Sequence, residues 1–144
     1  MFESSRVTSA TYTPLVSRSG RLYFDDVPDE YVGHVRAAAM TLPDAIEEKA
    51  ATGIRWRIRS NTFAQVLGVE GDEPVVALVF RAEGEDLDVL REVGHPFFSL
   101  PWGRGAVGMV LDDDTDWDDV GELVIDSYCV QAPKKLVALV ERPS

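Results

Sequence analysis

The segment IRWRIR, residues 54–59, alternates without exception between apolar and basic side chains. Successive side chains of a β-strand point to opposite faces of a sheet, so the basic face of this strand would carry Arg55, Arg57 and Arg59. Two further β-prone segments follow, residues 62–69 and 75–81, each after a short turn-forming stretch. Three consecutive strands joined by tight turns predict an antiparallel meander.

Apolar side chains recur at helical spacing in other parts of the chain. The spacing predicts helices near residues 28–41, over about 83–93 with Gly94 as the C-terminal cap, and from Asp116 to about Gln131. Ala132-Pro133 ends the last of these, and a short fourth helix can begin at Pro133. Before the third helix, the apolar segment 106–111 predicts one more strand, which follows a loop stiffened by two prolines.

A length of 144 residues with 45% apolar and 27% charged side chains fits one soluble globular domain. We expect residues 1–25 to form an N-terminal extension, either irregular or a short hairpin, and residues 26–144 to form a single domain. The one cysteine excludes an intrachain disulfide, and no Cys/His cluster suggests zinc. We see no signal peptide and no apolar run that could span a membrane, so we expect a cytoplasmic protein.

Residues 103–108 have the pattern Gly-x-Gly-x-x-Gly, which occurs in dinucleotide-binding turns. That motif needs a strand before it and a helix after it, because the helix N-terminus faces the pyrophosphate. Here the glycines follow a proline-rich loop and lead into a predicted strand. We therefore expect no nucleotide cofactor, and interpret the glycines as places where a strand bends or approaches a neighbour.

The acidic segment 112–119 begins with aspartates at alternate positions, as a calcium loop does. Its sixth position holds Trp117 where such a loop needs glycine, and its twelfth holds Leu123 where it needs a bidentate glutamate. We therefore expect no metal site. The segment instead resembles a helix start, with Thr115 as the N-cap and Asp118 as its capping-box partner.

The sequence offers no evident catalytic set. A nucleophile needs a base and an orienting group, and Cys129 lies in the middle of a predicted helix, where it is a packing residue. His34 lies off the apolar stripe of the first helix and is expected in solvent. We expect a non-enzymatic protein whose core includes Trp56 and Trp117, with Trp102 less buried.

One candidate contact surface is basic. The arginines of residues 54–59 would form a positive stripe about 13 Å long at about 3.3 Å per residue, long enough to follow phosphates. Lys134 and Lys135, at the start of the last helix, would form a second phosphate-reaching pair. Alternatively, the stripe is a solvent face that neighbouring acids neutralise. The net charge of −11 repels phosphate backbones and anionic membranes.

The second candidate is a rigid aromatic loop between residues 95 and 104. It would serve as a pocket or contact patch for a protein or a small ligand. Alternatively, the loop plugs one end of the core. The residues of this candidate contact loop are His95, Phe97, Phe98, Trp102 and Arg104.

Local motifs between about Val32 and Leu139 resemble the MmcQ/YjbR family. They are Leu42-Pro43, Glu47-Glu48, Arg57 with Phe63-Ala64, His95-Pro96-Phe97-Phe98, Trp102-Gly103-Arg104, Trp117-Asp118-Asp119-Val120, Asp126-Ser127-Tyr128 and Ala132-Pro133-Lys134-Lys135-Leu136. The resemblance implies an α+β protein, a two-layer α/β sandwich with helices on one face of an antiparallel sheet, similar in outline to secretion-chaperone-like proteins. It implies no catalytic residues, and at most weak DNA binding, an expectation that rests on fold analogy.

Overall fold

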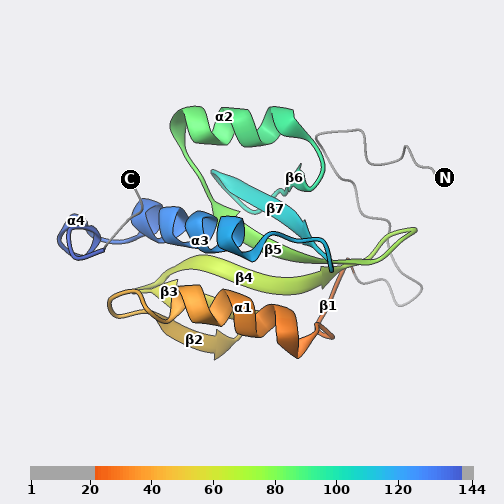
Figure 1. Ribbon diagram of the computed structural model, residues 1–144, viewed down its shortest axis with the longest axis horizontal. Coiled ribbons are helices and arrows are strands. Elements are labelled where there is room, and N and C mark those ends of the chain that lie inside the picture. The colour runs from red at the N-terminus through yellow and green to blue at the C-terminus, as the bar shows by residue number, and fades with distance from the viewer. Residues whose placement is uncertain (1–21, 141–144) are drawn as a thin grey trace.

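The computed structural model describes residues 22–140, and these form an α+β fold with one antiparallel sheet (Figure 1). The strands are β1 (Tyr23–Phe24), β2 (Ile46–Lys49), β3 (Ile54–Ile58), β4 (Asn61–Val69), β5 (Val75–Arg81), β6 (Phe97–Ser99) and β7 (Ala106–Leu111). The helices are α1 (Asp29–Ala39), α2 (Gly84–Val93), α3 (Trp117–Gln131) and α4 (Lys134–Val137). Of the expected extension at residues 1–25, residues 1–21 lie outside the described residues.

The predicted meander is confirmed as β3-β4-β5, and the predicted later strand is β7, which pairs antiparallel with β5. The strand order is β2-β3-β4-β5-β7-β6, with β1 paired to β4 outside this path. The sequence did not predict β2, a short polar strand that pairs with β3 at one edge. Nor did it predict β6, which lies within the expected loop and is only three residues long. Segments this short show no usable periodicity.

One face of the sheet carries the larger apolar core, covered by α1 and α3 (Figure 1). Trp56 is fully buried, as predicted, and the Tyr128 ring packs edge-on against Phe63 with ring centroids 5.3 Å apart. Trp117 was also predicted to be a core residue, but it begins α3 and is only half-buried at the edge of the core. The Trp117 ring stacks on the His34 ring, with centroids 4.3 Å apart. His34 is exposed, as expected, but one face of its ring is covered by this aromatic neighbour.

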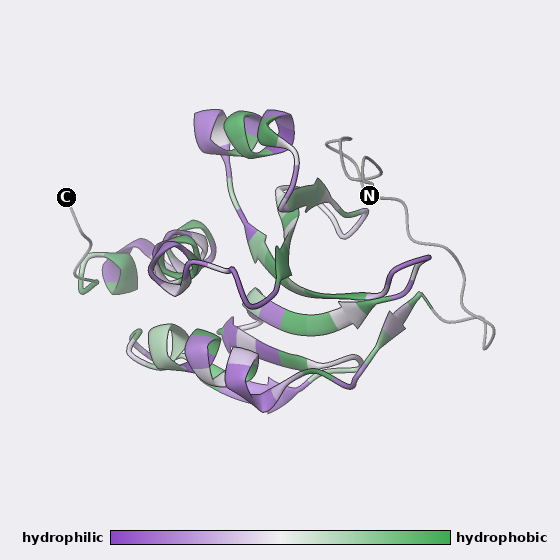
Figure 2. Cartoon of the chain, turned by 45° about the vertical axis from the view of Figure 1, so that its right-hand side comes forward, coloured by the Kyte–Doolittle hydropathy of each residue, from purple (hydrophilic) through white to green (hydrophobic). Residues whose placement is uncertain are grey.

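The opposite face carries a second, smaller apolar cluster. Its buried members come from β4, β5, β7 and the segment around β6: Leu67, Val69, Ala77, Val79, Phe98, Leu100 and Ala106. Tyr23 of β1 and Trp102 pack against it. Apolar residues accordingly run along the central strands, which Figure 2 shows in green. The strand β1 and the segment after β6 therefore contribute to the packing of this second face.

The start of α3 corrects one prediction. Its N-cap is Asp116, whose carboxylate accepts hydrogen bonds from the backbone N–H groups of Asp118 at 3.0 Å and Asp119 at 3.3 Å. The Thr115 hydroxyl instead accepts from the Asp112 N–H at 2.8 Å, so it closes the turn before the helix. Both residue types cap helices well. Asp116 takes this role because it directly precedes Trp117, the first helical residue.

The other helix boundaries lie near those predicted. The helix α1 spans Asp29–Ala39 within the expected 28–41, and Gly94 ends α2 with a φ of 81°, a conformation that favours glycine. No helix within residues 22–140 has the length and apolar character that a membrane crossing requires.

Candidate functional site

The turn that ends β3 and the short helix α4 lie at the same end of the molecule (Figure 1). Two hydrogen bonds attach the end of α3 to the turn between β3 and β4. Asn61 Nδ2 donates to the Gln131 carbonyl at 3.2 Å, and Gln131 Nε2 donates to the Thr62 carbonyl at 2.9 Å. Since α4 begins three residues later, Lys134 and Lys135 lie at this same end. We call the set Arg55, Arg57, Arg59, Lys134 and Lys135 the basic end.

Two arginines of the basic end share one carboxylate. Arg55 Nε donates to Glu48 Oε2 at 2.6 Å, and Arg57 Nε donates to Glu48 Oε1 at 3.0 Å. Glu48 lies on β2 directly opposite Arg55, so the strand pairing itself places the carboxylate. These hydrogen bonds, first that from Arg55 and then that from Arg57, lower the pKa of Glu48. The pairing leaves one net positive charge on the three groups.

The third arginine is paired more loosely. Arg59 has a φ of 57° at the turn after β3, and its Nη1 donates to Asp44 Oδ2 at 3.2 Å. The side chains of Arg59 and Asp44 are 50% and 57% exposed. Exposed pairs of this kind contribute about 0–1 kcal/mol, so an incoming anion can displace the carboxylate at little cost.

The two lysines differ from the arginines. Lys134 and Lys135 are exposed, and neither side chain forms a hydrogen bond or ion pair with any residue in the part of the chain that the structure describes. Buried Leu136 anchors α4 beside them. Five bases and their two carboxylate partners, Glu48 and Asp44, leave this end with a net charge of +3. The alternative stated for the arginine stripe, a solvent face paired with neighbouring acids, therefore describes the arginines. The two lysines have no such carboxylate partners among the described residues.

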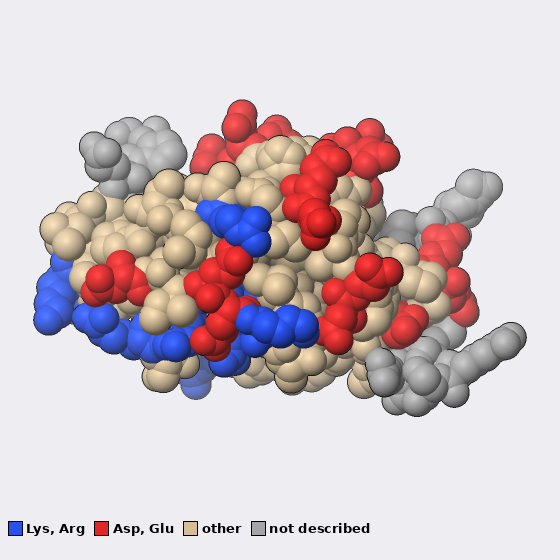
Figure 3. Space-filling view, turned by 90° about the horizontal axis from the view of Figure 1, so that it is seen from below, with Lys and Arg blue, Asp and Glu red and all other residues tan. Residues whose placement is uncertain are grey.

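Two more bases pair with carboxylates around β2, and sequence reasoning missed both. Arg36 of α1 donates to Glu47 at 2.7 and 2.9 Å, and Lys49 of β2 donates to Asp25 at 2.8 Å. Figure 3 shows the molecule from below the view of Figure 1. Lys and Arg side chains gather along part of this face, with Asp and Glu side chains between and beyond them. The unpredicted strand β2 is the reason for the omission, because it brings Glu47, Glu48 and Lys49 beside β3.

The candidate contact loop is built into the second apolar cluster. Phe98 is 4% exposed, and Trp102 Nε1 donates to the Tyr23 hydroxyl at 3.0 Å. The Arg81 guanidinium donates to the carbonyl oxygens of Trp102 and Arg104 at 3.0 and 2.9 Å. The side chains of His95 and Arg104 are exposed, and Phe97 is half-buried with its ring edge-on to Phe80. This arrangement favours the interpretation of the loop as a plug.

Each glycine of residues 103–108 has a structural reason to be glycine. Gly103 and Gly105 have φ values of 99° and 76°, and the Gly105 carbonyl accepts from the Ala82 N–H at 3.0 Å. A Cβ at Gly108 would overlap the Phe98 ring. The strand β7 begins inside the motif at Ala106, so the chain continues from these glycines into a strand and not into a helix.

The acids of residues 112–119 are engaged in turns and in the cap of α3. Asp112 Oδ1 accepts from the Asp114 N–H at 2.9 Å, and Asp113 Oδ1 accepts from the Tyr31 hydroxyl at 3.2 Å. Among residues 22–140, no group of three or more His, Cys, Asp or Glu side chains is arranged to hold a metal ion.

Comparisons of the chain with protein-family models, with curated proteins and with solved structures found no match.

Proposed function

We propose that this chain is a non-catalytic interaction protein of the MmcQ/YjbR type that contacts nucleic acid weakly through its basic end. The observation that carries the proposal is the position of Lys134 and Lys135. These two exposed lysines follow the end of α3, which is attached to the turn where the β3 arginine stripe ends at Arg59.

The arginines can add contacts without leaving their carboxylates. A guanidinium carries five N–H donors in a planar fork, and Arg55 and Arg57 direct only part of theirs to Glu48. Arg57 Nη1 also donates to the Arg59 carbonyl, and the N–H groups that remain are available to phosphate oxygens. Such contacts would follow the backbone without reading the bases, so they would give little sequence preference.

The charge balance predicts weak binding. The basic end carries a net charge of +3, whereas the whole chain carries −11. The remaining acids oppose approach of a polyanion from other sides. We expect affinity for random duplex DNA no tighter than about 10⁻⁴–10⁻⁶ M at physiological salt, the range of ordinary non-specific binding.

A paired-variant experiment tests this function. Fluorescence anisotropy of a labelled random DNA duplex, measured in about 50 mM salt, compares Lys134→Gln/Lys135→Gln with Arg91→Gln/Arg104→Gln. Both variants remove two exposed positive charges, but Arg91 and Arg104 lie away from the basic end. We expect the lysine variant to lose about tenfold or more in affinity per lost phosphate contact, and the control to change little.

Equal weakening of both variants would mean that net charge alone governs binding, and absence of binding by the wild type would refute the proposal.

The other expected function, a protein- or ligand-binding module at the candidate contact loop, has less support. Two of the three aromatic side chains of that loop, Phe98 and Trp102, pack within the fold.

A further inference from the structure

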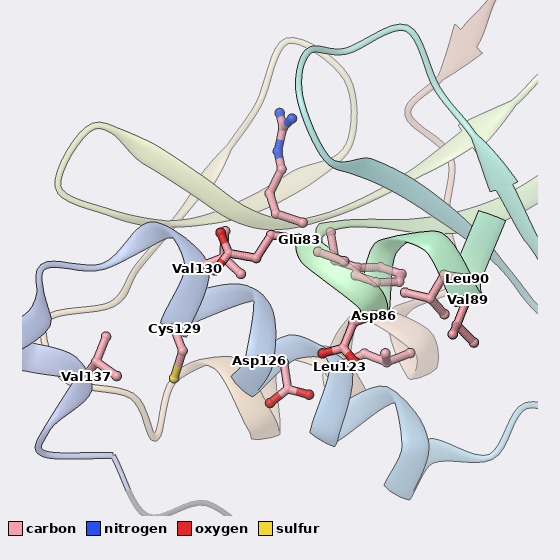
Figure 4. A pocket seen from close by; sticks show the side chains of 12 residues that line it. Glu83, Asp86, Val89, Leu90, Leu123, Asp126, Cys129, Val130 and Val137 are labelled. Atoms are coloured by element: carbon pink, nitrogen blue, oxygen red, sulfur yellow. The ribbon is translucent and has the colours of Figure 1, made fainter.

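A groove of about 420 Å³ lies between α2 and α3 and extends to α4 (Figure 4). Side chains of α2 and the residue before it, Glu83, Asp86, Val89 and Leu90, line one side. Side chains of α3, among them Leu123 and Cys129, line the other. The groove exists because α2 packs on β6 and β7 and stands apart from α3.

Apolar side chains form the inner part of the groove. The fully buried Phe80 forms part of its floor, and Leu90, Leu123 and Val137 are half-buried around it. No residue of α2 is buried. The most exposed large apolar side chains among residues 22–140 are Val89 (59%), Val93 (56%) and Leu139 (68%), which lie on α2 and directly after α4. Of these three residues, Val89 lines the groove, next to the half-buried Leu90. Apolar side chains exposed at a groove are typical of an interaction site.

The rim of the groove is acidic. Glu83, Asp86 and Asp126 line it. The only base among the lining residues is Arg81, whose guanidinium is held by the carbonyl oxygens of Trp102 and Arg104. An anionic ligand would be repelled, and a second copy of this chain, with a net charge of −11, would be repelled over the acidic part of its surface.

We propose that this groove binds a basic amphipathic peptide segment of a partner protein. The apolar side chains of the segment pack against Leu90, Leu123 and Val89, and its Lys or Arg side chains pair with Glu83 and Asp86. This is the helix-in-groove mode of recognition, in which apolar anchors give affinity and flanking charges give orientation. No residue of the basic end lines the groove, so the proposal does not depend on nucleic-acid binding.

Cys129 provides a built-in reporter, because it lines the groove and is the only cysteine of the chain. The probe is a synthetic 14-residue peptide of Leu and Lys at helical spacing, and the control peptide has Glu in place of Lys. We expect the Leu/Lys peptide to slow the reaction of Cys129 with a thiol reagent several-fold, and the Leu/Glu peptide to leave the rate unchanged. Anisotropy of the labelled peptides gives their affinities independently.

Two variants on the same helix separate the groove from general charge. Glu83→Gln/Asp86→Asn removes two charges that line the groove, and Glu85→Gln/Asp88→Asn removes two that do not. All four side chains are exposed, so both variants should fold, which circular dichroism and thermal melting verify. We expect the first variant to weaken peptide binding and Cys129 protection several-fold, and the second to retain both.

Each contrary outcome overturns the proposal in a specific way. Equal weakening by both variants would mean non-specific attraction, and equal binding of the Leu/Glu peptide would mean that the acidic rim plays no part. Binding without protection of Cys129 would place the peptide elsewhere. Protection that grows with protein concentration alone would identify a second copy as the occupant. A rise in Cys129 reactivity on deletion of residues 141–144 would identify the C-terminal segment of the chain itself.

Discussion

The indole nitrogen of Trp56 donates a hydrogen bond of 2.8 Å to the carboxylate of Glu47. Trp56 is fully buried in the main core, whereas Glu47 lies on the edge strand β2 and also accepts two hydrogen bonds from Arg36 of α1. One carboxylate therefore connects α1, β2 and β3. It also satisfies the only polar atom of the largest fully buried side chain.

Removal of this carboxylate should destabilise the fold. Glu47→Ala leaves the Trp56 N–H without its acceptor, and an unsatisfied buried donor costs about 1–3 kcal/mol. Glu47→Gln keeps an oxygen that can accept this hydrogen bond, so its cost should be smaller. Urea unfolding of both variants measures the difference. Equal stability of Glu47→Ala and the wild type would show that the hydrogen bond contributes nothing.

The same residue should make stability depend on pH in the acid range. The hydrogen bond from Arg36 and then that from Trp56 lower the pKa of Glu47, although its partial burial opposes this. A depressed native-state pKa stabilises the fold fully above the ordinary glutamate pKa of about 4.3, and the stabilisation disappears as pH falls through the native value. The stability difference between the wild type and Glu47→Gln should therefore shrink as pH falls from 6 toward that value. A constant difference across this range would contradict the prediction.

The N-cap of α3 can be tested by two single substitutions. Asp116→Ala removes the acceptor for the N–H groups of Asp118 and Asp119 and should cost about 1 kcal/mol. Thr115→Ala loses only the hydrogen bond from the Asp112 N–H within the preceding turn, so its effect should be smaller. Thermal melts of the two variants give the order. The reverse order would place the cap at Thr115, as the sequence pattern suggested.

The two tryptophans of the predicted core should respond differently to truncation. Trp56→Ala should cost about 3–5 kcal/mol, because the side chain is fully buried. Trp117→Ala should cost clearly less, because Trp117 is half-buried and packs on His34 and Tyr31 at the outer end of the helix layer. Chemical denaturation would refute this assignment if both substitutions cost the same.

Strong periodicity explains which elements the sequence predicted. The strands β3, β4, β5 and β7 are alternating or continuously apolar, and α1, α2 and α3 carry apolar stripes with proline or glycine at their ends. The strand β2, with the sequence Ile-Glu-Glu-Lys, has no such pattern. It is held by backbone pairing with β3 and by ion pairs across that pairing, which a linear sequence does not display.

The candidate sites divide in the same way. The residues of the basic end could be named from the sequence, because arginines at every second position are a local pattern. That Glu48 holds two of them could not, because the pairing of β2 with β3 decides it. The groove between α2 and α3 could not be predicted either. It is formed by segments that are about forty residues apart, and its shape depends on where α2 packs.

The salt dependence of duplex DNA binding tests the proposed role of the basic end most directly. With a net charge of +3 at this end, the slope of log affinity against log salt should be about −2.7, at about −0.9 per neutralised phosphate. Lys134→Gln/Lys135→Gln should reduce the slope to about −0.9, whereas Arg91→Gln/Arg104→Gln should leave it near the wild-type value. A slope that the lysine substitutions do not change, or the absence of binding even at low salt, would contradict the proposal.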